Sequence, residues 1–143
     1  MNDAPHYDDS LTIALLRARE AVTAQFREHV TAAGLTLPQW RVIRALAGGV
    51  EMDTTTLADR TVILPPSLTR ILRHLGKNDL IEQVPARDRR QRVIRLTATG
   101  QSLFDEVWQV SQTRYAAIEA AFGEQEMVVL VESLNRLRRS LKG

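Results

Sequence analysis

The stretch "LPPSLTRILRHLGKNDLI" (residues 64–81) decides the fold, because it separates into two unlike faces when it is read as a helix. Pro65 is unsuited to a helix interior but suits a first turn, so the helix is expected to begin there. An apolar stripe follows at helical spacing: Leu68, Ile71, Leu72 and Leu75. The opposite face is polar or basic: Pro66, Thr69, Arg70, Arg73, His74 and Lys77, with Ser67 at its edge. We expect the first face to pack on the domain and the second to meet a partner.

A basic β-hairpin is expected directly after this helix. Two short β-like segments, Leu80–Val84 and Arg92–Leu96, are joined by an arginine-rich connection. From Ser67 to Arg95 eight basic residues face three acidic ones, a net charge of +5, whereas the whole chain carries only +2. The expected tip arginines are Arg87, Arg89, Arg90 and Arg92. Asp88 is expected to pair with a neighbouring arginine and fix the tip.

Helical patterns surround this segment on both sides. Residues 9–34 form one long helix, Thr36 and Gln39 can cap the next, and Asp53 can cap a third. After the hairpin, two long helices broken at Gly123 are expected within residues 98–143. The fold class is therefore mainly α with a small β-hairpin: a single unit over residues 1–143, with a winged helix-turn-helix lobe over 36–97. The outer helices, 9–34 and 98–143, are apolar on several sides, so we expect them to dimerise with a second copy.

The composition excludes several kinds of site. The chain holds no cysteine, which excludes disulfides, thiolate zinc sites and cysteine nucleophiles. Its three histidines show no metal-ligand spacing, so neither a metal nor a cofactor is expected. No Ser/His/Asp arrangement or phosphate-binding glycine loop is present, so we do not expect an enzyme. No apolar run nears 18 residues and no signal segment is present, so we expect no membrane partner and a cytoplasmic location.

The basic helix face and the basic hairpin together indicate double-stranded DNA as the partner. Alone, each pattern is more often an ordinary solvated surface. A basic helix face followed directly by a basic hairpin, within this order of helices, favours a nucleic-acid-binding protein. The second helix of a helix-turn-helix enters the major groove, where Arg70 and Arg73 can reach guanine edges or phosphates. The arginines of the hairpin suit the negative potential of a minor groove. A helical interaction or architectural protein is the competing interpretation.

The first helix holds two residues that suggest a ligand site. Arg19 and His29 fall inside its apolar arc, where an unpaired charge is expensive to bury. Arg19 either pairs with an acid, in the fold or across the dimer, or binds a carboxylate ligand. Trp40 is either a core residue or the aromatic wall of that pocket, and His29 either a buried histidine or a ligand contact. Arg44, like Arg41, is expected to be exposed and to meet phosphate or the pocket rim.

These residues resemble the MarR family of bacterial transcription regulators. The hairpin matches the family's D-x-R-x-x-x-x-x-L-T pattern at Asp88, Arg90, Leu96 and Thr97, with Gly100 following. The stretch "LTLPQWRVIRALA" (35–47) resembles the family's second helix, and residues 64–81 resemble its recognition helix. The resemblance implies an obligate homodimer, a pseudo-palindromic operator, and derepression by a small, often aromatic acid effector.

A narrower resemblance concerns the regulated genes. "DDSLTIALLRAREA" (8–21) and "ILPPSLTRIL" (63–72) resemble the subgroup that represses homoprotocatechuate (4-hydroxyphenylacetate) degradation operons. That subgroup is expected to carry a basic residue where this chain has Pro65, which puts one phosphate contact in doubt. The alternatives are a MarR-type regulator of stress or efflux genes, or a ligand-blind architectural DNA-binding protein.

Overall fold

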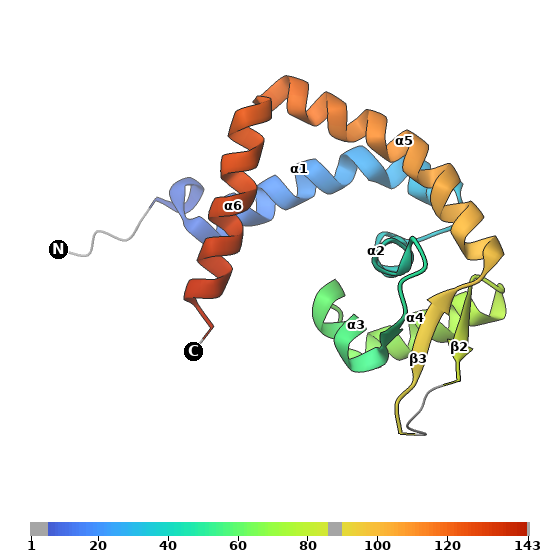
Figure 1. Ribbon diagram of the computed structural model, residues 1–143. Helices are drawn as coiled ribbons and strands as arrows, with labels where there is room; N and C mark the ends of the chain where they lie inside the picture. Colours follow the sequence, from blue (N-terminus) through green and yellow to red (C-terminus); the bar gives the residue numbers. More distant parts are fainter. Residues whose placement is uncertain (1–5, 86–89, 143) are drawn as a thin grey trace. The chain divides into compact units, whose positions relative to one another are not determined.

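The computed structural model describes residues 6–85 and 90–142. The chain divides into two compact units, residues 1–109 and residues 110–143. Within the described residues, the first unit holds four α-helices, a small sheet and the start of a fifth helix (Figure 1). The second unit holds the end of that helix and a sixth. The fold class predicted from the sequence, mainly helical with a winged helix-turn-helix, is confirmed.

The predicted order of elements is present along the chain. Both predicted strands begin one residue later than expected, and a short strand before the third helix was not predicted. A 3₁₀ turn over Tyr7–Asp9 precedes the first helix. The bounds are α1 Leu11–Ala32, α2 Leu37–Leu46, β1 Met52–Asp53, α3 Thr54–Thr61, α4 Pro65–Lys77, β2 Ile81–Val84, β3 Val93–Leu96, α5 Ala98–Phe122 and α6 Glu124–Ser140.

Side-chain caps fix the starts of α2 and α3. The Gln39 N–H donates to the Thr36 hydroxyl at 3.2 Å, and the Thr36 N–H donates to the Gln39 amide oxygen at 3.0 Å. This reciprocal pair satisfies two backbone donors that a helix start leaves without partners. At α3 the Asp53 carboxylate accepts from the Thr56 N–H at 2.8 Å. Both predicted caps are confirmed.

A three-stranded antiparallel sheet forms the wing, in the order β1-β3-β2. The two long strands pair in the register Ile81↔Leu96 to Val84↔Val93, as the predicted hairpin requires. β1 adds to the other edge of β3 through the pair Met52↔Ile94. Its two residues carry no alternation pattern, which is why the sequence did not predict it. The extra strand ties the hairpin to the start of α3.

The core of the first unit lies between α2, α3, α4 and the sheet, which are gathered together in Figure 1. Each element contributes side chains that are almost completely removed from solvent, and α4 contributes three leucines. The buried residues of these elements are Trp40, Val42, Ile43, Leu46, Met52, Leu57, Leu68, Leu72, Leu75, Ile81 and Ile94. Burial on this scale positions α4 and the hairpin relative to each other.

The start of α5 is joined tightly to the end of α4. The Thr97 hydroxyl donates to the Asp79 carbonyl oxygen at 2.6 Å and accepts from the Gly100 N–H at 3.0 Å. The Gly100 backbone packs against the Leu80 carbonyl so closely that a Cβ atom would collide with it. These contacts explain the Leu-Thr-x-x-Gly pattern, because they hold the backbone between β3 and α5 against the end of α4.

Several helices keep apolar side chains in solvent. On α1 only Phe26 and Val30 are buried, whereas Leu11, Leu15 and Val22 are between 38% and 58% exposed. In the second unit, α6 buries none of its residues and exposes a run of four apolar ones: Val128, Val129, Leu130 and Val131. Among residues 6–85 and 90–142, no helix has the length and hydropathy that crossing a bilayer requires.

Candidate nucleic-acid interface

Helix α4 separates sharply into a buried and an exposed face. Leu68, Leu72 and Leu75 are 2%, 8% and 0% exposed, which holds the helix on its domain. No acidic residue lies on α4, and no carboxylate pairs with its cations among the described residues. The residues predicted to contact DNA lie exposed, except Ser67, which is half-buried: Pro66, Thr69, Arg70, Arg73, His74 and Lys77. The helix thus presents an uncompensated positive face.

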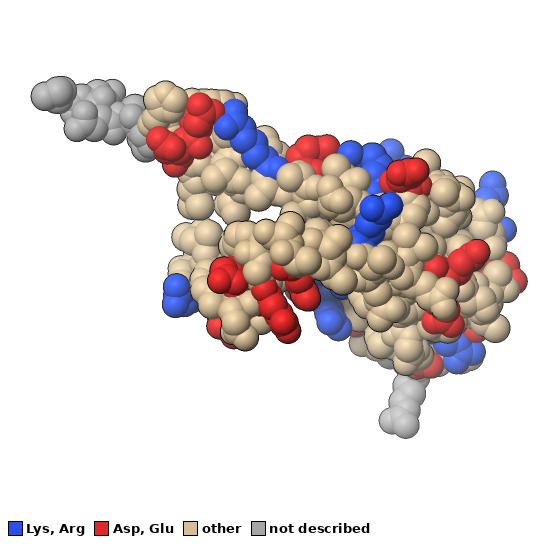
Figure 2. All heavy atoms as spheres, turned by 90° about the horizontal axis from the view of Figure 1, so that it is seen from above, with Lys and Arg blue, Asp and Glu red and all other residues tan. Residues whose placement is uncertain are grey.

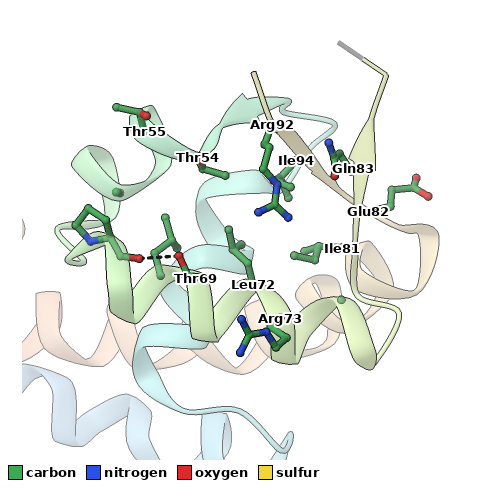
Figure 3. Close-up of a pocket in the computed structure, with 14 residues that line it drawn as sticks. Thr54, Thr55, Thr69, Leu72, Arg73, Ile81, Glu82, Gln83, Arg92 and Ile94 are labelled. Carbon is green, nitrogen blue, oxygen red and sulfur yellow. Dashed lines mark hydrogen bonds between the residues drawn. The ribbon is translucent and has the colours of Figure 1, made fainter. Parts of the chain in front are cut away.

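A hollow of about 410 Å³ separates α4 from the wing (Figure 3). Its floor is apolar, formed by Leu72, Ile81 and Ile94. Arg73 lines it from α4 and Arg92 from the approach to β3, and in Figure 3 their guanidinium groups lie on different sides of α4. Each guanidinium group can hold a backbone phosphate through charge-assisted hydrogen bonds.

The backbone at Arg92 is fixed by the start of α3. The Thr54 N–H donates to the Arg92 carbonyl oxygen at 3.2 Å. The neighbouring Asp53 carboxylate accepts from Thr56, and this backbone hydrogen bond lowers the pKa of Asp53. The unpredicted strand β1 and the cap of α3 therefore hold the root of the wing in place.

The outer part of the wing is only partly described. Arg90 and Arg92 are exposed, as expected for a basic hairpin. Arg87, Asp88 and Arg89 lie outside the described residues. The expected pairing of Asp88 at the tip therefore stays a prediction.

Arg95, which the sequence counts as part of the basic segment, is held by two carboxylates. Its Nε lies 3.0 Å from Glu82 Oε1, and its Nη1 lies 3.4 Å from Glu51 Oε1. Both partners raise the pKa of Arg95, with Glu82 contributing most. Arg95 thus braces β3 to β2 and to the residue before β1. The local charge of +5 therefore overstates what this segment offers to an external anion.

An aromatic stack links two of the predicted ligand residues. Trp40 is buried and stacks on Phe104, with ring centroids 5.4 Å apart, and Phe104 stacks on Trp108 at 5.7 Å. The Arg44 guanidinium lies 5.0 Å from the centre of the Trp108 ring. Phe104 and Trp108 were missed as site residues, although their spacing of four on one helix places them on the same face. Trp40 and Arg44 thus meet at one cluster.

The other two predicted ligand residues lie on α1. His29 is half-buried and meets the Phe26 ring edge-on, at 5.8 Å. Arg19 is exposed in this chain, and no carboxylate pairs with it among the described residues. The apolar arc around it is largely exposed within one chain, and its expected packing against a second copy stays a prediction.

Arg41 differs from its expected exposed position on α2. It is partly buried, and its Nη1 donates to the Thr61 carbonyl oxygen at 2.8 Å, at the end of α3. Burial lowers the pKa of Arg41, and the positive charge of Arg19 lowers it further. The prediction of an exposed Arg41 is wrong because the last carbonyl groups of α3 need a donor.

Charge on the face shown in Figure 2 is mixed. Seen from above, lysine and arginine side chains stand among acidic ones (Figure 2). On that face the described residues form no continuous basic surface. The face therefore lacks the concentration of positive charge found along α4.

Comparisons with known proteins agree with this geometry. A model of the MarR family matches residues 33–91. The chain is 39% identical over 131 residues to the HTH-type transcriptional regulator FarR of Neisseria gonorrhoeae, covering 91% of this chain and 90% of that protein. It is 42% identical over 127 residues to the homoprotocatechuate degradative operon repressor of Escherichia coli, covering 88% of this chain and 86% of that one. The crystal structure of NadR in complex with 4-hydroxyphenylacetate is 38% identical, with a TM-score of 0.83 over 95% of this chain and 97% of that one.

The different environments of Arg73 and Arg95 predict different salt dependences of DNA binding. Replacing Arg73 removes one cation that is free to neutralise a phosphate. Arg73→Gln should therefore lower the slope of log affinity against log salt concentration by about one. Arg95→Gln should leave this slope unchanged, because Glu82 and Glu51 hold its side chain. The measurement is a salt titration of duplex binding by fluorescence anisotropy, and equal slopes for the two variants would contradict this assignment.

Proposed function

The chain belongs to the MarR family of transcription regulators, and we propose that it is a homodimeric repressor of an aromatic-acid degradation operon. We further propose that an aromatic carboxylate releases it from its operator. The observation that carries the proposal is the division of α4 into a buried leucine face and an exposed cationic face. The name of the repressor from Escherichia coli supports homoprotocatechuate degradation as the regulated process, and the complex of NadR with 4-hydroxyphenylacetate supports an aromatic acid as the effector.

The proposed interface has two parts that read DNA differently. Helix α4 enters the major groove, and the wing reaches the neighbouring minor groove. Arg73 and Arg92, which both line the hollow between α4 and the wing, contact the phosphate backbone between the two grooves. The proposed contacts are Pro66, Ser67, Thr69, Arg70, Arg73, His74 and Lys77 from α4, and Arg87, Arg89, Arg90 and Arg92 from the wing.

A homodimer on a pseudo-palindromic operator accounts for the exposed apolar side chains. α1 and α6 each keep several large apolar residues in solvent within one chain. Exposed apolar patches on this scale favour a protein interface. In a two-fold dimer the two copies of α4 lie about 34 Å apart, one turn of DNA, so that both half-sites are read together.

The proposed effector site lies at the arginines of α1 and α2. Arg19 and Arg41 are close enough for the charge of one to lower the pKa of the other. A carboxylate beside them would relieve this repulsion, and Arg44 is held nearby on the same helix as Arg41 by Trp108. The aromatic stack that begins at Trp40 offers a ring surface for the aromatic part of the ligand. The proposed ligand residues are Arg19, His29, Trp40 and Arg44.

Helix α2 can couple this site to DNA. Neighbouring residues of α2 point to two places: Trp40 to the aromatic stack and Arg41 to the Thr61 carbonyl, just before α4. A ligand that shifts α2 therefore also shifts the turn that positions α4. A coupling free energy of about 1–3 kcal/mol changes DNA affinity roughly 5- to 150-fold, and DNA must weaken ligand binding by the same factor.

The first test is binding to the DNA upstream of the protein's own gene and its neighbours. Fluorescence anisotropy at fixed salt should give tight binding that survives competitor DNA. Added 4-hydroxyphenylacetate or 3,4-dihydroxyphenylacetate should then weaken it at least fivefold. Tight binding that neither acid weakens would support a DNA-binding regulator but contradict its role in aromatic-acid degradation. Equal binding to any duplex would indicate an architectural protein.

The proposed role of Arg44 can be separated from DNA binding. Arg44→Gln removes a charged partner of the carboxylate, so the acid concentration needed for release should rise at least tenfold. DNA affinity without acid should stay within about twofold of wild type. Arg27→Gln is the matched control, since Arg27 is an exposed arginine that pairs with Glu20 on α1. Calorimetric titration with the acid measures both variants, and an unchanged response in Arg44→Gln would contradict the site.

A further inference from the structure

The turn between α3 and α4 exposes two apolar side chains beside the proposed DNA-reading helix. Val62 is 85% exposed and Leu64 is 75% exposed, whereas Leu68, one turn further along, is 2% exposed. Both side chains line a hollow of about 410 Å³ between this turn and the starts of α2 and α4. Such exposure excludes a role for either side chain in the core of this chain.

The backbone at Val62 is unusual for its residue type. Val62 has φ 56° and ψ 46°, the left-handed conformation, and closes α3. The Ile63 N–H donates to the Ala58 carbonyl at 3.1 Å and the Val62 N–H to the Asp59 carbonyl at 3.3 Å, a Schellman ending. Glycine or asparagine is usual at this position, and a β-branched residue is strained there. The geometry at the end of α3 therefore does not explain why a valine occupies this position. A contact of its side chain with a molecule outside the chain would explain it.

The charges around the hollow indicate what that contact is. The charged residues that line it are Arg41 and Arg70, and no acidic side chain joins them within the described part of the chain. A cationic rim around apolar side chains suits a polyanion that also carries apolar groups. Duplex DNA is such a partner, because the thymine 5-methyl is the apolar group displayed in its major groove.

The position of Leu64 matches this partner. Leu64 is the residue at the N-cap of α4, directly before Pro65, and its side chain makes no capping bond. In helix-turn-helix proteins the amino-terminal end of the second helix contacts base edges. A leucine there has no hydrogen-bonding group, so it can recognise only an apolar feature of the base.

We propose that Leu64, with Val62 completing the apolar surface, contacts the 5-methyl group of a thymine in each operator half-site. This inference rests on the proposed function and deepens it, since it assigns a sequence preference to two residues that the α4 face does not include. Val62 and Leu64 are then specificity residues, and the neighbouring Arg70 supplies the phosphate or base contact that holds them in place.

The test replaces single thymines by deoxyuridine, which removes the methyl group and keeps base pairing. The duplex is the tightest binder that the wild-type protein recovers from a random-sequence pool. Each half-site should contain one sensitive thymine. A single substitution at that position should weaken wild-type binding about fourfold, which corresponds to the free energy of burying one methyl-sized group. For Leu64→Ala the two duplexes should bind equally. Val50→Ala, which truncates an exposed valine (36%) outside α1, α4 and residues 98–143, should keep the fourfold difference.

A second variant separates a DNA contact from a structural role. Val62→Gly relieves the backbone strain, so its thermal midpoint should equal or exceed that of wild type. Its affinity for the selected duplex should nevertheless fall several-fold. A residue with only a structural role would change stability and affinity in the same direction.

Three results would overturn the proposal in distinguishable ways. If no thymine is sensitive, or if Leu64→Ala keeps the full sensitivity, DNA binding stands but the methyl contact is wrong. If Leu64→Ala instead dissociates the dimer in sedimentation, the occupant of the surface is a second copy of the chain. If the wild-type protein selects no duplex at all, the proposed function fails and the methyl contact fails with it.

Discussion

The burial of one face of α4 is the constraint on which the rest of the structure depends. Leu68, Leu72 and Leu75 are almost completely buried against α2, α3 and the sheet. A fully buried leucine contributes about 1.5–3 kcal/mol, whereas water screens the exposed ion pairs of Arg95, so that they contribute little to stability. The leucines therefore hold the helix, and the ion pairs only refine the wing. Since these leucines face inward, Arg70, Arg73 and Lys77 must face out.

Helix α2 contacts both parts of the molecule to which the family resemblance assigns a function: the DNA-binding helix and the residues of the proposed ligand site. Its buried residues pack in the same core as α4, while Trp40 and Arg44 turn to the aromatic stack. Arg41 bonds the end of α3, immediately before the strained Val62 and the exposed Leu64. In the proposed mechanism a ligand does not need to touch the DNA-reading residues, because α2 already contacts the turn that carries them.

Local patterns predicted most of the winged lobe from the sequence. The capping box at Thr36, the cap at Asp53, the two faces of α4 and the paired strands each depend on residues close together in the chain. The strand β1 was missed, because two residues carry no periodicity and form a strand only beside β3. The partners of Arg41 and Arg95 were missed for the same reason: Thr61, Glu51 and Glu82 lie more than ten residues away. The arc around Arg19 lies largely exposed within one chain, and its predicted packing against a second copy stays a prediction.

The placement of α4 in the major groove is tested most directly by methylation interference on a duplex selected by the protein. Dimethyl sulfate methylates guanine N7 in the major groove and adenine N3 in the minor groove. If α4 reads the major groove and the wing the minor groove, guanine interference should appear in two clusters about one helical turn apart, with adenine interference beside each cluster. Interference at adenine alone, or a single guanine cluster, would contradict the placement of α4 or the two-fold arrangement.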